Sequence, residues 1–253
     1  METHEHQHET HHEGNKSPDI QKELKSHLSG AAETLKDIKS GGKFDIGKEF
    51  MNAIEVLKLN GKKMEEIANL KSAALPALLF IVIGALAFHI GVYYYIANMF
   101  KGLAGLAGLA GMDDVSFAPP ILDLAISFVL LVVVSVVEIF VVDFVANTFF
   151  KGQGKFGQLF RVLGYANLAM VLSLFMQIGF IGGIWMLVVT YVALTKLKKL
   201  DSTNTVLTII ISLVIVAVLS YLLNLLFVNV LHLSGMFSMY NADYYSMMNS
   251  KLY

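Results

Sequence analysis

The strongest constraint on this chain is the length of its uncharged stretches. Residues 72–100 and 162–195 contain no Lys, Arg, Asp or Glu over 29 and 34 positions. About 20 helical residues cross a bilayer core about 30 Å thick, so stretches of this length are typical of spanning helices. Only 15% of the residues are charged, against about 25% in a typical soluble domain. The sequence therefore predicts an all-α polytopic membrane protein.

Five transmembrane helices are expected in a membrane domain over residues 73–231. Residues 162–195 would measure about 51 Å as one helix, far more than a bilayer core, so we expect a hairpin turning near residues 179–183. The predicted spans are 74–95, 121–148, 162–177, 183–195 and 205–227.

The distribution of basic residues predicts the orientation. With five spans, the inner segments 1–73, 149–161 and 196–203 carry 11, 3 and 3 Lys and Arg residues. The outer segments carry only Lys101 and Lys251. Because Lys and Arg are enriched in cytoplasmic loops, we expect a cytoplasmic N-terminus and an external C-terminus.

The first 16 residues form a tail rich in His and Glu, which we expect to be disordered. Dense His tracts bind transition metals, so a weak metal-binding tail is the alternative. Two H-E-x-x-H matches occur here, but a metalloprotease also needs an ordered helix, a third ligand and a cleft. The candidate metal ligands are His4, His6, His8, His11 and His12.

Residues 17–72 are expected to form cytoplasmic amphipathic helices. Ser17-Pro18-Asp19 is typical of a helix start, and apolar residues then recur every three or four positions. The first stripe comprises Ile20, Leu24, Leu28, Ala31, Leu35 and Ile38, and the second comprises Phe50, Ile54, Leu57, Met64, Ile67 and Leu70. These helices could pack on the membrane domain, lie on membrane lipid or bind a cytoplasmic partner.

Two external segments are also expected. Residues 102–111 repeat Gly-Leu-Ala and predict a mobile or interfacial loop. Residues 232–253 form an external tail rich in Met and Tyr, for which packing at the interface is favoured over copper binding.

Several classes of function are excluded or left without support. The chain has no cysteine, which excludes disulfide scaffolds, Cys-ligated metals and a Cys nucleophile. The formal net charge of −1 gives no support for nucleic acid as a partner. No ordered Ser, His and Asp set or paired carboxylate supplies an active site, so we expect neither enzymatic activity nor a cofactor.

The link between the second and third predicted spans carries the most informative motif. Three glycines permit a sharp turn, Phe156 is expected to anchor at the lipid headgroups, and Arg161 is expected to reach lipid phosphate. Gly164 would admit a neighbouring helix, and the Tyr165 hydroxyl requires a partner. The motif residues are Gly152, Gly154, Phe156, Leu159, Arg161, Gly164 and Tyr165.

This run resembles the Yip-one domain family of multi-pass membrane proteins, named for interaction with Ypt/Rab GTPases. The resemblance extends over about residues 50–230 and includes Gly164-Tyr165-Ala166 and Ile184-Trp185-Met186-Leu187. The Asp-Leu-Tyr-Gly-Pro segment of eukaryotic members has no counterpart before the first span, so the chain resembles a prokaryotic-type branch. The resemblance implies a non-enzymatic scaffold or adaptor that binds partner proteins, other membrane proteins or a second copy of itself.

Two acidic residues in the second span are the remaining candidates. Glu138 lies near mid-depth and should face the bundle, where an acid is either structural or part of an ion pathway. Asp143 lies about 140° away around the helix and is expected to pair with Lys155 or Arg161. His89 is a candidate partner for Glu138. The alternative function is therefore a small transporter or channel component that uses Glu138.

Overall fold

The computed structural model describes residues 20–40, 44–106, 121–175 and 178–229, and every regular element within them is helical. The predicted tails 1–16 and 232–253 lie outside the described residues. The elements are α1 Ile20–Lys39, α2 Ile46–Leu57, α3 Gly61–Asn69, η1 Lys71–Ala73, α4 Ala74–Leu106, α5 Ile121–Phe150, α6 Phe156–Ala166, η2 Asn167–Leu174, α7 Gly179–Leu197 and α8 Ser202–Asn229.

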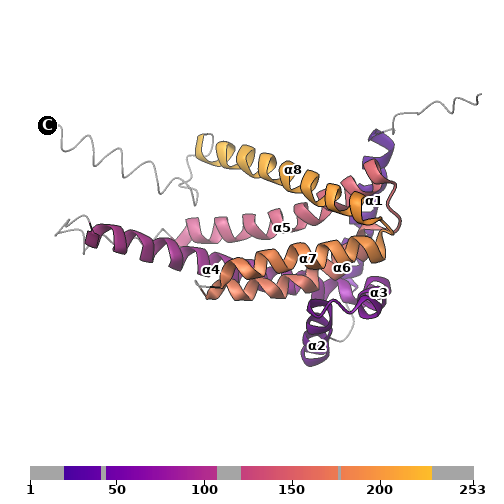
Figure 1. Cartoon of the computed structure of the whole chain (residues 1–253), viewed down its shortest axis with the longest axis horizontal. Helices are drawn as coiled ribbons and strands as arrows, with labels where there is room; N and C mark the ends of the chain where they lie inside the picture. Colours follow the sequence, from indigo (N-terminus) through magenta and orange to yellow (C-terminus); the bar gives the residue numbers. More distant parts are fainter. Residues whose placement is uncertain (1–19, 41–43, 107–120, 176–177, 230–253) are drawn as a thin grey trace, which may run out of the picture.

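Four of these helices are long and apolar enough to cross a membrane. The spanning segments are Lys71–Ile96, Leu124–Phe150, Gly179–Leu197 and Ser202–Leu223. They lie within or overlap α4, α5, α7 and α8, which form an elongated bundle in which α4 reaches furthest toward one end (Figure 1). Helix α4 continues to Leu106 and so includes the first part of the segment expected to be a loop.

The predicted third span, 162–177, is not a single long helix. Helix α6 ends at Ala166 after 11 residues, and the 3₁₀-helix η2 continues for eight residues to Leu174. The carbonyl groups of η2 lie against glycines of α4, a long-range contact that apolar periodicity does not report. Helix α7 packs alongside η2, as a hairpin requires, but residues 179–183, which were expected to form the turn, are the first residues of α7.

Small residues of α4 allow this close packing. Ala77, Gly84 and Gly91 recur at intervals of seven and therefore lie on one face of the helix. A Cβ atom added to Gly84 would lie 2.5 Å from the Asn167 carbonyl oxygen, and one added to Gly91 would lie 1.9 Å from that of Ser173. The two backbones are thus in direct contact at positions where only glycine fits.

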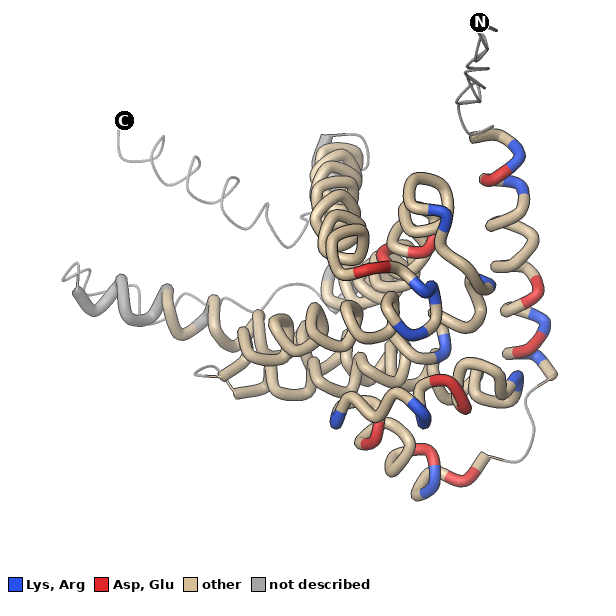
Figure 2. Tube along the Cα trace, turned by 45° about the vertical axis from the view of Figure 1, so that its right-hand side comes forward, with Lys and Arg blue, Asp and Glu red and all other residues tan. Residues whose placement is uncertain are grey.

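The N-terminal helices gather at one end of the bundle, where most of the described charged residues also lie (Figures 1 and 2). Helices α2 and α3 bury Val56, Met64 and Ile67 in the same hydrophobic core as Leu159 of α6. Helix α1 is arranged differently. It buries His27, Thr34 and Asp37, whereas most of its predicted apolar stripe is exposed.

Three helices at this end stop at a residue in the left-handed conformation. Leu59 follows α2 with a φ of 61°, Lys151 follows α5 with 54°, and Lys199 follows α7 with 55°. A left-handed residue beyond the last turn is a common helix terminator, but glycine usually occupies it.

The contact between α4 and η2 generates a stability prediction. Gly91→Ala places a methyl group against a backbone carbonyl that cannot rotate away, so we expect a loss of about 1–3 kcal/mol from overpacking. The measurement is the thermal unfolding midpoint of the full chain in mild detergent.

Gly183→Ala is the matched control, because no atom lies within 4 Å of a Cβ added there. It should leave the midpoint unchanged or raise it slightly, since alanine is favoured over glycine inside a helix. Equal midpoints for the two variants would contradict the close packing of α4 on η2.

Candidate functional site

The glycine-rich link predicted as a motif forms a tight connection between α5 and α6. The Gly152 N–H donates to the Ala146 carbonyl at 2.9 Å, which folds the chain back over the last turn of α5. Gly154 has a φ of 82°, a conformation that strongly favours glycine. The Gln158 side-chain oxygen then accepts from the Lys155 N–H at 3.0 Å and caps the start of α6.

The apolar motif residues belong to the protein core rather than to the lipid interface. Phe156 and Leu159 are 5% and 0% exposed, and the Phe156 ring contacts Phe140 and Phe160. The expectation that Phe156 anchors at lipid headgroups is therefore wrong. The reason is that α1 and α5 cover the aromatic face of α6, which the local sequence does not reveal.

Arg161 also has protein partners in place of lipid phosphate. Its guanidinium donates to the Asp37 carboxylate at 2.7 Å and to the Ala68 carbonyl at 2.6 Å. The Arg161 side chain is only 8% exposed, so this ion pair is almost dry. One arginine thus connects α6 to α1 and to the end of α3.

The final pair of motif residues fixes α6 against α4 and α2. A Cβ added to Gly164 would lie 2.6 Å from the Ala77 Cβ, so glycine is required where α6 approaches α4. The Tyr165 ring is fully buried beside Phe80, and its hydroxyl donates to the Glu49 carboxylate of α2. The sequence predicted that the Tyr165 hydroxyl needs a partner, and that partner is an acid from the N-terminal region.

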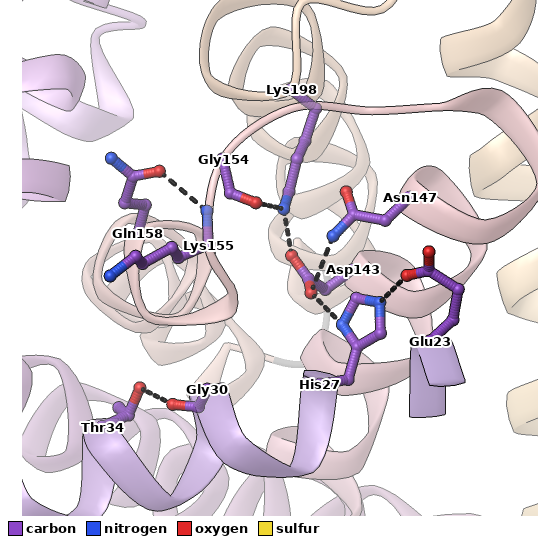
Figure 3. Close-up of polar contacts among 10 residues, drawn as sticks. All are labelled: Glu23, His27, Gly30, Thr34, Asp143, Asn147, Gly154, Lys155, Gln158 and Lys198. Carbon is purple, nitrogen blue, oxygen red and sulfur yellow. Dashed lines mark hydrogen bonds and ion pairs between the residues drawn. The ribbon is translucent and has the colours of Figure 1, made fainter. Parts of the chain in front are cut away.

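Asp143 is the centre of a buried ionic cluster (Figure 3). Its carboxylate forms an ion pair with the Lys198 Nζ, and both side chains are 0% exposed. The His27 Nδ1 of α1 lies 2.8 Å from the second Asp143 oxygen, and Asn147 donates to that oxygen at 3.4 Å. The predicted partners Lys155 and Arg161 are wrong for Asp143, because Lys155 lies 3.7 Å from Glu33 and Arg161 pairs with Asp37.

The cluster joins four separate parts of the chain. Lys198 also donates to the Gly154 carbonyl at 3.1 Å, and the Gln153 N–H donates to the Lys198 carbonyl at 2.9 Å. Burial lowers the pKa of Lys198, and the neighbouring Asp143 charge opposes that change. His27, Lys198 and Asp37 were missed by sequence reasoning; the available signal was that a buried acid at the end of a span requires a base.

Glu138 lies apart from this cluster and lines a cavity between the helices, but it is an exposed residue and is not enclosed by the bundle as the sequence predicted. The cavity has a volume of about 350 Å³ and is lined by residues of α4 to α8, with the polar members Ser135, Glu138, Asn167, Thr190 and Ser212. Among the described residues, Glu138 has no ion-pair partner. The proposed pairing with His89 is wrong, because the His89 Nε2 lies 3.5 Å from the Ser127 hydroxyl.

A second, smaller cavity opens where α1, α3 and α6 meet. Its volume is about 240 Å³, and residues of both charge signs line it: the acids Glu33 and Asp37 and the bases Lys71, Lys155 and Arg161. No group of three or more His, Asp or Glu that could hold a metal ion occurs within the described part of the chain. The His residues proposed as metal ligands lie outside it.

The buried cluster generates a prediction about Lys198. Lys198→Met leaves the Asp143 carboxylate without its cation, and breaking a buried pair costs about 3–5 kcal/mol. We expect a large drop in the unfolding midpoint in detergent, partly recovered by the double variant Asp143→Asn/Lys198→Met.

The neighbouring residue provides the control. Lys199 is 56% exposed on its side chain and lies 3.7 Å from Glu65, so Lys199→Met should change stability by only about 0–1 kcal/mol. If Lys198→Met were as mild as Lys199→Met, the ion pair would not be a main determinant of stability.

The profile of the Yip1 domain matches residues 54–236, which is more than half of the chain. The matched region begins within α2 and includes every motif residue from Gly152 to Tyr165. No curated protein and no solved structure matches the chain.

Proposed function

Because the chain belongs to the Yip1 domain family, whose members are generally non-enzymatic and linked to vesicle trafficking, we propose that it is a five-span membrane scaffold that binds a cytoplasmic partner. The observation that carries this proposal is the charged cavity where α1, α3 and α6 meet. Buried ion pairs hold the helices around it, so the surface is preformed. A preformed surface loses little conformational entropy on binding a partner.

The partner that fits this cavity is a polar segment of a cytoplasmic protein. Lys71 and Lys155 are exposed at its rim, and Asn69 presents an amide whose oxygen accepts from Gln158 at 2.9 Å. Exposed lysines beside an acid favour a segment carrying charges of both signs. The exposed apolar faces of α8, such as Ile210 and Val214, remain available for lipid, other membrane proteins or a second copy of the chain.

Five spans are part of the proposal, with the hairpin from α6 to α7 supplying the third and fourth. The 11 residues of α6 and the eight of η2 extend about 32 Å together, because a 3₁₀-helix rises about 2 Å per residue. The 19 residues of α7 extend about 28 Å. Both arms approach the 30 Å of a bilayer core, which supports five spans and termini on opposite sides of the membrane. The excess of Lys and Arg in segments 1–73, 149–161 and 196–203 supports a cytoplasmic N-terminus. The missing Asp-Leu-Tyr-Gly-Pro segment supports a prokaryotic-type branch.

The alternative function is transport through the cavity at Glu138. Two observations favour this candidate. Glu138 has no ion-pair partner among the described residues, and the buried Ser212 hydroxyl at the same cavity has no hydrogen-bond partner. Such a site inside the membrane is a pathway for a proton or a cation by default.

The partner-binding proposal predicts the effect of charge reversal at the cavity. The full chain carrying Lys71→Glu and Lys155→Glu should lose a cytoplasmic partner that the wild-type chain captures from its own cells in mild detergent. Both lysines are exposed, so the fold should be retained. Lys62→Glu is the matched control, because Lys62 is exposed on α3 and does not line the cavity. If the wild-type chain, the double variant and the Lys62→Glu control all captured the same partner, the result would contradict the proposal.

The topology is tested with single cysteines, since the native chain has none. Gln153→Cys and Thr203→Cys should react with an impermeant thiol reagent only after the membrane is opened. Phe180→Cys, at the tip of the hairpin and 66% exposed, should react in intact cells. Reaction of Phe180→Cys only in opened cells would reduce the number of spans to four or fewer.

Glu138→Gln separates the two functions. If the chain is a scaffold, this variant should leave partner capture, stability and the proton and cation permeability of reconstituted vesicles unchanged. A flux that is present with the wild-type chain and abolished by Glu138→Gln would support transport in its place.

A further inference from the structure

Helix α1 presents three different surfaces around its axis. At about 100° per residue, Leu24 lies about 60° from His27 and about 180° from Glu33. The first surface is polar and buried, comprising His27, Thr34 and Asp37, which are 5%, 4% and 8% exposed.

The second surface is apolar and uncovered in the monomer. Its four members are the large residues of the predicted stripe, and they are between 41% and 59% exposed: Ile20, Leu24, Leu28 and Leu35. None of these four residues belongs to the hydrophobic core or to the partly buried residues packed against it, among which α1 contributes Ala31 and Ile38. In water alone, four such side chains on one short helix would be an unfavourable exposure.

The third surface is charged and lies opposite the apolar one. It carries Lys22, Lys25, Glu33 and Lys36, all exposed. Helix α1 thus has protein on one side, apolar residues at about a right angle to that side, and charges opposite the apolar residues. This is the pattern of a helix that lies in the membrane plane beside a membrane protein. Figure 1 shows α1 running across the inner end of the bundle rather than along it.

Contacts at the two edges of α1 fix which surface faces the bilayer. Near the apolar edge, the His27 ring packs edge-on against Phe140 and Phe144, within the membrane-spanning segment of α5. On the charged side, the Glu33 carboxylate lies 3.7 Å from Lys155, which belongs to the link beyond the end of that segment. The apolar surface therefore turns toward the spans and the charged surface turns away from them.

We propose that α1 lies in the inner-leaflet interface, with Ile20, Leu24, Leu28 and Leu35 inserted among the lipid acyl chains. The occupant of this surface is lipid rather than a protein, because the neighbouring His27 packs against Phe140 and Phe144 inside a membrane-spanning segment, which places the apolar side chains of α1 at the depth of that segment. The ion pairs of Asp143 and Arg161 would then hold α1 at a fixed depth. Helices of this kind bury their apolar face about 5–10 Å into the boundary between headgroups and acyl chains.

The test is depth-dependent fluorescence quenching on the full chain in phosphatidylcholine vesicles. Leu24→Cys and Leu28→Cys report on the apolar surface, and Lys25→Cys and Lys36→Cys report on the charged surface of the same helix. Each cysteine receives an environment-sensitive fluorophore, and all four sites are exposed, so the fold should tolerate the label. Equal unfolding midpoints for the labelled proteins check this point.

The expected result is opposite behaviour on the two surfaces. Labels at Leu24→Cys and Leu28→Cys should be quenched several-fold more by brominated lipid, and several-fold less by aqueous iodide, than labels at Lys25→Cys and Lys36→Cys. Equal iodide quenching on both surfaces would overturn the proposal and indicate a helix in water. Protection of the leucine positions from both quenchers would also overturn it and indicate protein on that surface.

Discussion

A buried carboxylate near the end of α5 holds together the end of this protein at which the N-terminal helices gather. Burying the Asp143 carboxylate away from water costs free energy, and the contacts with Lys198, His27 and Asn147 offset that cost. Lys198 comes from the end of α7 and His27 comes from α1, which is more than 100 residues earlier in the chain. The positions of α1, the link to α6 and the end of α7 therefore depend on one acid.

The N-terminal helices are consequently part of the membrane domain and not a tethered appendage. Arg161 and Tyr165 of α6 make their polar contacts with Asp37 and Glu49, while Trp185 of α7 donates to the Leu57 carbonyl at 3.0 Å. Residues that the sequence places in a cytoplasmic region thus complete the hydrogen bonding of residues in the bundle. Removing residues 1–71 would deprive the buried Arg161 of its ion pair with Asp37 and the buried Asp143 of its contact with His27.

Sequence reasoning predicted the parts of this fold that depend on local composition. Four long apolar helices follow from uncharged stretches, and the structure contains them. The predicted turn at residues 179–183 was misplaced, because these residues begin α7. The change from α6 to η2 was not predictable, because it accompanies contacts of Asn167 and Ser173 with glycines of α4 about 80 residues away. The partners predicted for Arg161 and Asp143 were wrong for the same reason, because their actual partners also lie far away in the sequence. Charge and depth indicate that a partner is needed, whereas only the fold determines which residue supplies it.

The left-handed residues at the ends of α5 and α7 bear on how the chain enters a membrane. Lys151 and Lys199 adopt a conformation that costs a residue with a side chain about 1 kcal/mol or more relative to glycine. Each lysine also places a positive charge beside the end of a spanning helix, where basic residues direct insertion. Glycine at these two positions would relax the finished protein but remove two of the signals read during its synthesis. At these two helix ends, an unfavourable backbone conformation therefore coincides with the residue type that orients spanning helices.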